Sequence, residues 1–150
     1  YNTIKMIEIK QIKTSETYAI RIEVLRKRIE LPFEFYGDFY ENTFHLGAFK
    51  ENELLGVATF MEFENPLFRG SQYQLRGMAV LPLWRKRRIG AMILEKSLII
   101  LRDRTIRVLW CNARDNAVGF YKKQGFDLIG KAFEVKLIGT HFLMRKYVMS

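Results

Sequence analysis

The chain has 150 residues, of which 49% are hydrophobic and 27% are charged, and its formal net charge is +9. This length and composition predict one globular domain over residues 1–150 and exclude a disordered chain. The longest apolar stretch, residues 89–101, is interrupted by Glu95 and Lys96, so the sequence predicts no membrane-spanning helix. The positive charge favours an anionic partner, such as a phosphorylated cofactor or a nucleic acid.

Cys111 is the single cysteine, which excludes an internal disulfide and fits a reducing, cytoplasmic location. It falls in a predicted buried strand and no His or Asp pattern accompanies it. We therefore interpret it as a structural thiol rather than a nucleophile. No group of residues has the spacing of a metal site, so the sequence predicts no metal.

The first part of the chain is predicted to form a strand and a helix. Residues 5–11 alternate apolar and polar side chains, which is typical of a strand. An amphipathic helix is predicted over residues 16–30, because apolar residues recur there at helical spacing. These residues are Tyr18, Ile22, Leu25 and Ile29. Pro32 ends this helix, and residues 33–42 are predicted to form a loop or a short helix.

The middle of the chain is predicted to continue the sheet. Residues 43–50 and 53–63 form a hairpin across the turn between them. Strands at 72–80 and 105–112 flank a strongly apolar helix at 89–102, and this order predicts a right-handed parallel crossover.

The last part is predicted to add one short helix and two strands. Asp115 is a candidate cap for a helix that continues through Lys123, and Gly125 breaks it. Strands at 126–137 and 140–148 then form an antiparallel pair. The whole order is β-α-β-β-β-α-β-α-β-β. It indicates an α/β (α+β) fold with a mixed, largely antiparallel twisted sheet of six or seven strands and helices on both faces.

A strand, a basic loop and a helix follow one another from Gln74 to Leu94. The loop contains four consecutive cations, residues 85–88, directly before the helix. A helix N-terminus has free N–H groups and the positive end of the helix dipole, so it binds phosphate well. Gly90 and Ala91 are small, so an anion can approach the backbone. A solvated basic loop before a core helix is the alternative interpretation of the charges.

This loop resembles the phosphate loop of the GNAT superfamily of acyl-CoA N-acyltransferases, whose pattern is Arg/Gln-x-x-Gly-x-Gly/Ala. Arg85 occupies the first position of the pattern and Gly90 the last. Arg88 stands where the pattern has its middle glycine. A bulky residue there either narrows the pyrophosphate site or donates to a phosphate.

Residues 109–126 resemble the closing signature of the same family, a strand that ends near Asn-Ala-Arg followed by Ala-x-x-Phe-Tyr-x-x-x-Gly-Phe. The match is carried by Ala117, Phe120, Tyr121, Gly125 and Phe126. Arg114 stands where many relatives have Asn. Together the two signatures imply a GNAT-like sheet and an N-acetyltransferase, which moves an acetyl group from acetyl-CoA to a primary amine by direct attack in a ternary complex.

The resemblance also implies the cofactor-binding residues. Backbone amides of the strand that carries Met78 to Val80 bind the pantetheine arm, and one N–H polarises the thioester carbonyl. The full predicted set for acetyl-CoA is Met78, Ala79, Val80, Arg85, Lys86, Arg87, Arg88, Ile89, Gly90, Ala91, Asn112, Asn116, Phe120, Tyr121 and Lys123.

Tyr121 matches the residue that the family uses as the acid for the leaving thiolate. The base is less defined, because the strand before the phosphate loop lacks the Glu that the family often has there. Glu62 and Glu64 on the preceding strand are candidates, with a solvated strand end as the alternative. His141 is the other candidate, since histidine titrates near neutrality, with a structural role as the alternative.

The acceptor amine itself is not predicted. Aromatic residues of 33–42 either line an apolar acceptor groove or cover the sheet, namely Phe33, Phe35, Tyr36, Phe39 and Tyr40. One further hypothesis is that Glu34, Asp38 and Glu41 attract a cationic amine. Two other functions stay open: an acyl-CoA-binding sensor or pseudoenzyme, and a basic nucleic-acid-binding module, which the single basic cluster makes less favoured. Edge strands near the C-terminus make a homodimer a further expectation.

Overall fold

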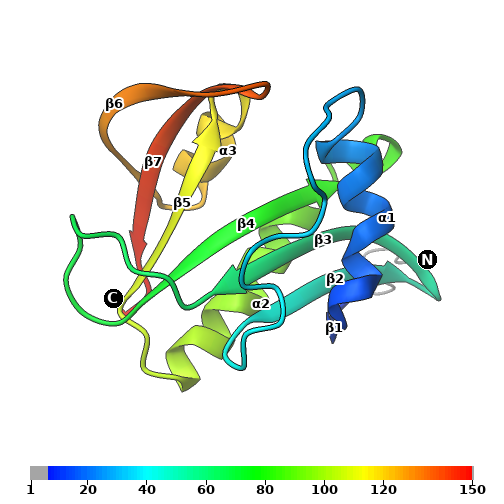
Figure 1. The fold of residues 1–150 in the computed structure, drawn as a ribbon. Helices are drawn as coiled ribbons and strands as arrows, with labels where there is room; N and C mark the ends of the chain where they lie inside the picture. The colour runs from blue at the N-terminus through cyan, green and yellow to red at the C-terminus, as the bar shows by residue number, and fades with distance from the viewer. Residues whose placement is uncertain (1–6, 150) are drawn as a thin grey trace.

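The structure is a computed structural model that describes residues 7–149. Its strands are β1 (Ile7–Ile12), β2 (Phe44–Lys50), β3 (Glu53–Met61), β4 (Gln72–Val80), β5 (Val108–Arg114), β6 (Asp127–Val135) and β7 (Gly139–Tyr147). They form one seven-stranded sheet in the order β1-β2-β3-β4-β5-β7-β6 (Figure 1). β4 and β5 pair in parallel, and the other neighbouring pairs are antiparallel. The predicted mixed, largely antiparallel sheet is confirmed.

The helices lie on both faces of this sheet, as predicted. α1 (Tyr18–Ile20) is the middle of a helical segment over residues 14–25, which begins with a 3₁₀ turn and ends with a π-helical turn. This segment crosses one face, while α2 (Ile89–Asp103) lies against the other (Figure 1). α3 (Val118–Lys123) follows a 3₁₀ turn and packs against β5 and β6. No helix within residues 7–149 is long and apolar enough to cross a membrane.

The first helix is shorter than predicted and buries a different face. The prediction extended to residue 30, but the helical turns end at Leu25. Ile22, which belongs to the predicted apolar stripe, is 46% exposed, whereas Arg21 is completely buried. The reason is an ion pair between Arg21 and Asp38. A pattern built on apolar residues alone cannot find a helix face that buries a paired charge.

Two other boundaries differ from the prediction. The strand predicted at 105–112 begins later, at Val108, because Thr105 lies in the turn after α2 with a φ of 56°. The residue at the cap position of α3 is Ala117 rather than Asp115. The first predicted strand began at Lys5, which lies outside the described residues.

The main core fills the space between the sheet and the helices α2 and α3. Its completely buried members include Leu46, Phe60, Ile93, Leu109 and Met144. A smaller cluster lies on the opposite face of the sheet and consists of Ile20, Val57 and Ala79. The two clusters hold β4 between α2 on one face and the first helical segment on the other.

Candidate active site

β4 and β5 separate along their length. Their parallel pairing joins residues 72–74 to residues 108–110, and beyond these pairs the strands diverge (Figure 1). Next to this gap the register between β4 and β3 shifts, and Gly77 has a φ of 65°. The backbone of Met78, Ala79 and Val80 therefore has no partner strand on the side of β5. Its polar groups are available to a ligand.

The N-terminus of α2 has open backbone N–H groups. The N–H of Met92 donates to the Arg88 carbonyl at 2.9 Å. The N–H groups of Ile89, Gly90 and Ala91 have no backbone acceptor outside the helix among the described residues. Such groups, at the positive end of a helix of this length, form a favourable site for a phosphate.

The cations of the preceding loop are all exposed, and they surround this helix end with positive charge. Arg85 Nε lies 3.4 Å from the Val80 carbonyl oxygen, at the end of β4. The Arg87 guanidinium lies 5.1 Å from the centre of the Trp84 ring. The loop thus connects the unpaired edge of β4 to the N-terminus of α2.

Arg88 adopts the backbone conformation that a glycine would take at this position of the pattern. Its φ is 63° and its ψ is 14°, in the left-handed region that strains residues with a Cβ atom. Its guanidinium forms an exposed ion pair with Glu95, with an Nη2–O distance of 3.0 Å. The side chain thus lies along α2, and the loop keeps its conformation without a glycine.

Gly90 brings the two signature segments into contact. A Cβ atom added to Gly90 would lie 3.0 Å from Cζ and 3.3 Å from Cε1 of Phe120 on α3. The N-terminus of α2 therefore packs directly on this ring. A larger residue at position 90 would have to displace it.

Tyr121 is buried in the main core between two aromatic neighbours. Its ring centre lies 5.1 Å from that of Phe120 and 5.2 Å from that of Phe126. Burial raises the pKa of Tyr121 well above its usual value, with a smaller contribution from Cys111. The phenol is therefore protonated at neutral pH, as a proton donor must be. Burial also raises the pKa of Cys111, in agreement with its interpretation as a structural thiol.

The remaining predicted cofactor residues lie around the gap at different depths. Met78 and Val80 pack against the main core, while Ala79 belongs to the cluster on the opposite face. Asn112 is exposed on β5, on the face opposite to the buried Cys111, because side chains alternate along a strand. Besides Asn112 and the cations of residues 85–88, the exposed residues of the predicted set are Asn116 and Lys123, at the two ends of the α3 segment.

His141 lies on β7, which pairs with β5 on the side away from β4, and its side chain is buried. It is the cross-strand partner of Arg114, the last residue of β5. Its ring Nδ1 lies 2.9 Å from the Gly139 carbonyl oxygen. Because a carbonyl oxygen only accepts, Nδ1 carries the hydrogen, and Nε2 of the neutral ring keeps a lone pair. This is the tautomer that a base at Nε2 requires.

Glu62 lies at the other end of β4. It follows Met61, which pairs with Gln74, where β4 and β5 are still joined. Its exposed carboxylate accepts a hydrogen bond from Asn42 Nδ2 at 3.0 Å. Glu62 therefore lies away from the gap, whereas His141 lies beside Arg114, the last residue of the β5 strand that borders the gap.

Comparison with known proteins agrees with this arrangement. The sequence profile of the acetyltransferase (GNAT) family matches residues 8–126. The chain belongs to the GNAT family. It is 34% identical over 143 residues to the uncharacterized N-acetyltransferase YitI of Bacillus subtilis (strain 168), a match that covers 94% of this chain and 96% of YitI. These matches identify the protein as an acetyltransferase enzyme.

Solved structures show the same GNAT fold at low sequence identity. Escherichia coli ElaA is 18% identical, with a TM-score of 0.76, and the match covers 94% of this chain and 99% of ElaA. An aminoglycoside 6'-N-acetyltransferase complexed with coenzyme A is 12% identical, with a TM-score of 0.73, and the match covers 95% and 98% of the two chains.

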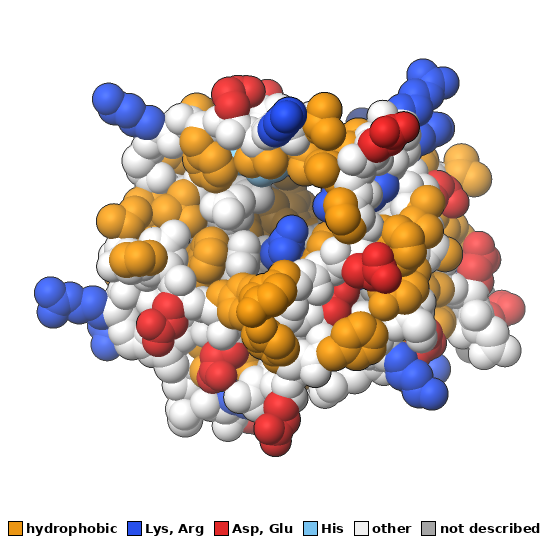
Figure 2. All heavy atoms as spheres, in the orientation of Figure 1, with side chains coloured by type: hydrophobic (Ala, Val, Ile, Leu, Met, Phe, Trp, Pro, Cys, Tyr) orange, Lys and Arg blue, Asp and Glu red, His pale blue; other side chains and the backbone are white. Residues whose placement is uncertain are grey.

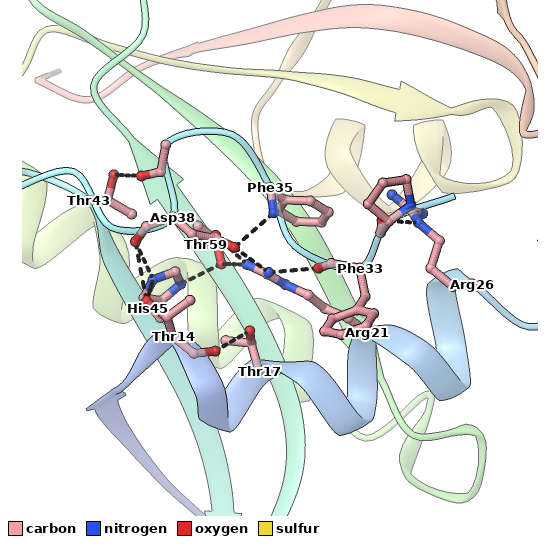
Figure 3. A network of polar contacts seen from close by, with 12 residues as sticks. Thr14, Thr17, Arg21, Arg26, Phe33, Phe35, Asp38, Thr43, His45 and Thr59 are labelled. Carbon is pink, nitrogen blue, oxygen red and sulfur yellow. Dashed lines mark hydrogen bonds and ion pairs between the residues drawn. The ribbon is translucent and has the colours of Figure 1, made fainter. Parts of the chain in front are cut away.

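This GNAT protein also contains a buried polar network that sequence reasoning missed (Figure 3). Arg21 donates from Nη1 and Nη2 to the two carboxylate oxygens of Asp38, at 2.8 and 2.9 Å. The same nitrogens donate to the Phe33 carbonyl at 2.9 Å and to Thr59 Oγ1 at 2.8 Å. Burial alone would raise the pKa of Asp38, but hydrogen bonds from Arg21 and from the Phe35 N–H outweigh burial and lower it.

His45 extends this network. Thr59 Oγ1 accepts from Arg21, so its own hydrogen is free to point to His45 Nδ1 at 2.7 Å. His45 Nε2 lies 2.9 Å from Thr14 Oγ1 and 3.2 Å from the Asp38 carbonyl oxygen. Both ring nitrogens are thus satisfied in the neutral form. Burial lowers the pKa of His45 in spite of the nearby Asp38. In the sequence, no neighbouring pattern marked this histidine.

The network overturns part of the predicted acceptor site. Asp38 is expected from the sequence to attract a cationic amine, but it is buried and neutralised by Arg21. The aromatic residues of the same segment differ in their exposure to solvent. Phe35 is buried with its ring centre 3.8 Å from the Arg21 guanidinium, whereas Tyr36 and Phe39 are 77% and 78% exposed.

Proposed function

We propose that this GNAT protein is an N-acetyltransferase that transfers an acetyl group from acetyl-CoA to a primary amine by direct attack in a ternary complex. The observation that carries the proposal is the gap between β4 and β5, which opens beside the free N-terminus of α2. Family membership supports the acetyl donor, as does the coenzyme A bound to a neighbour of the same fold.

The residues present fit acetyl-CoA. The N–H groups of Ile89, Gly90 and Ala91, with the cations of 85–88, would hold the pyrophosphate. The unpaired edge of β4 at Met78–Val80 would hydrogen-bond the pantetheine arm. When bound, acetyl-CoA supplies the thioester that the amine attacks. Four further contacts stay predictions from the family resemblance, namely Asn112, Asn116, Phe120 and Lys123.

Three groups of this chain would then handle charge and protons. An N–H of the β4 edge would stabilise the negative charge that develops on the carbonyl oxygen. Nε2 of His141 would take a proton from the amine, since an alkyl amine with a pKa of about 10.4 is mostly protonated at neutral pH. Tyr121 would give its phenolic proton to the leaving thiolate. Glu62 is kept as the second candidate base, for comparison by mutation.

A homodimer and a cytoplasmic location stay predictions. The sheet offers β6 as an edge strand, and most residues of β6 are exposed. Such an edge is able to pair with a second strand.

The first test is the melting temperature with and without acetyl-CoA. A ligand that binds only the folded state must raise the melting temperature. We expect a clear rise for the parent and none for Gly90→Glu, which places a negative charge at the free N–H groups. Ile99→Glu is the matched control, because it adds the same charge to an exposed position of α2 away from the N-terminus. No rise with acetyl-CoA, free CoA or longer acyl-CoAs would refute the proposed cofactor site.

A further inference from the structure

Two arginines converge on a single carbonyl oxygen at the end of the first helical segment. Arg26 Nη1 and Arg114 Nη2 each donate to the Leu25 carbonyl at 3.2 Å. Arg26 comes from the residues after the helical segment, and Arg114 ends β5. Two like charges are thus held close together by segments that are far apart in the sequence. This arrangement is unfavourable unless a negative charge balances it.

A third arginine joins them from β4. The Arg76 guanidinium lies 4.2 Å from the centre of the Phe35 ring, and the Arg26 guanidinium lies 5.8 Å from the same centre. Arg76 donates no hydrogen bond to any residue within 7–149. The Arg76 side chain is half-buried. None of its nitrogen atoms is among the fully buried side-chain atoms without a hydrogen bond, so its N–H donors reach solvent.

Within residues 7–149, no acidic side chain forms an ion pair with this cluster, which consists of Arg26, Arg76 and Arg114. The ion pairs among the described residues are Lys10–Glu8, Arg21–Asp38, Arg88–Glu95 and Arg145–Asp127. Both carboxylate oxygens of Asp38 are taken by Arg21. The three guanidiniums therefore have no carboxylate partner in the described part of the chain.

The pKa shifts of the three arginines agree with the absence of an ion-pair partner in the described residues. The pKa of Arg76 is lowered by burial and then by Arg26 and Arg21, and the opposing effect of Asp38 is smaller. Burial, Arg114 and Arg21 lower the pKa of Arg26, and burial lowers that of Arg114. Each shift reports a position where positive charge is less favourable than in water.

The cluster lies at the gap where the acceptor must enter. Arg76 precedes the unpaired residues of β4, and Arg114 is the cross-strand partner of His141. Figure 2 shows this face hollowed near its middle, over the gap between β4 and β5 of Figure 1, with Lys or Arg side chains at the edge of the hollow. The free N-terminus of α2 lies on the other side of the sheet, against which α2 packs. A pyrophosphate bound there would leave the arginine cluster unoccupied.

We infer that Arg26, Arg76 and Arg114 bind an anionic group of the acceptor, so that the amine substrate also carries a carboxylate or a phosphate. This inference rests on the proposed acetyltransferase function. Guanidinium groups suit both anions, because their planar forks donate two parallel hydrogen bonds. An anion held by Arg114 lies next to His141, so a substrate with its amine a few bonds from the anion presents that amine to the candidate base.

Paired acceptors test this inference. Release of the CoA thiol from acetyl-CoA is measured with L-amino acids and their amides, and with O-phosphoethanolamine and ethanolamine. The two members of each pair differ in one anionic group. The amino acids and their amides test for a carboxylate, and the two ethanolamines test for a phosphate. The variants are Arg76→Gln and Arg114→Gln, with Arg69→Gln as the control, because Arg69 is an exposed arginine outside the cluster. Melting temperatures with acetyl-CoA are recorded in parallel.

We expect kcat/KM to be at least about tenfold higher for the anionic member of one kind of pair. Arg76→Gln and Arg114→Gln should each raise the KM for that acceptor about tenfold and leave the KM for acetyl-CoA and the neutral partner within about twofold. Arg69→Gln should change neither. The inference would be overturned if the neutral acceptor of each pair were acetylated as efficiently as the anionic one, or if both arginine variants kept the wild-type preference for the anionic acceptor. Acetyl-CoA binding without acetylation of any anionic acceptor would also overturn it. The comparison of anionic and neutral acceptors with the wild-type protein tests the inference even if a variant does not fold. Absence of acetyl-CoA binding is a separate result that overturns the proposed function and the inference with it.

Discussion

Arg21 and Asp38 form an ion pair that is closed to solvent on both sides, with side-chain exposures of 0% and 1%. Both carboxylate oxygens are used, at 2.8 and 2.9 Å. A buried pair of this kind is not a strong net stabiliser compared with apolar residues, but it is costly to break from one side. Its main effect here is positional. It fixes residues 33–42 against the first helical segment and thereby places Phe35 beside Arg76.

Asp38→Asn should therefore destabilise the protein strongly. It leaves the charge of Arg21 buried without a partner, which costs about 3–5 kcal/mol. The matched control is Asp127→Asn, which removes the carboxylate from the more exposed Arg145–Asp127 pair and should cost about 0–1 kcal/mol. Urea unfolding of both variants measures the difference. An equal loss of unfolding free energy in the two variants would show that the buried ion pair is no more important for stability than the exposed one.

Stability should fall as the pH is lowered through the range where His45 titrates. The pKa of His45 is lowered from 6.5 in the folded protein, so below about pH 6.5 the unfolded chain binds a proton that the folded chain does not. The loss continues until the lower folded pKa is reached. His45→Gln should flatten the curve of unfolding free energy between about pH 7 and 5.

The control is the part of the same curve of unfolding free energy at low pH, where Asp38 titrates. The pKa of Asp38 is lowered from 3.8, so its contribution is present above that value and is lost as the pH falls further, through the folded pKa. This acidic loss should persist in His45→Gln. A slope between pH 7 and 5 that is unchanged in His45→Gln would assign the titration to another group.

Tyr121→Phe should lower kcat by about 10²–10⁴-fold, because it removes the proposed proton donor for the leaving thiolate. The phenol makes no hydrogen bond to a described residue, so the fold and the melting-temperature rise with acetyl-CoA should be retained. Tyr147→Phe, at an exposed position of β7, is the control. Unaltered turnover by Tyr121→Phe would remove Tyr121 from the proposed mechanism.

The two candidate bases can be separated by mutation. His141→Gln should reduce kcat/KM by about 10²–10⁴-fold. Glu62→Gln should stay within about twofold of the parent, because Glu62 lies where β4 and β5 are still joined. The reverse ranking of the two variants in steady-state kinetics would identify Glu62 as the base.

Arg88→Gly should stabilise the start of α2. Arg88 occupies the left-handed region with a φ of 63°, and relief of that strain is worth about 1 kcal/mol. The exposed ion pair with Glu95 that is lost contributes less, about 0.5 kcal/mol. Glu95→Ala measures that smaller contribution alone. A lower melting temperature for Arg88→Gly than for Glu95→Ala would contradict this account.

The sequence by itself determined the order of the elements, the family and the position of the basic loop before α2. These features depend on local chemistry: hydrophobic periodicity, a basic loop directly before a helix, and a closing signature with defined spacing. Short-range patterns of this kind survive in a single sequence, because each residue is constrained mainly by its neighbours along the chain.

Only the tertiary structure decided which charges meet. Asp38 looked like a surface acid, but Arg21 is 17 residues away in the chain and neutralises it in the fold. Arg114 lies 89 residues from the Leu25 carbonyl that it shares with Arg26. The balance of a charged cluster depends on distances through space and on burial. The proposal that the acceptor amine also carries an anionic group, which Glu34, Asp38 and Glu41 did not suggest, therefore came from the fold.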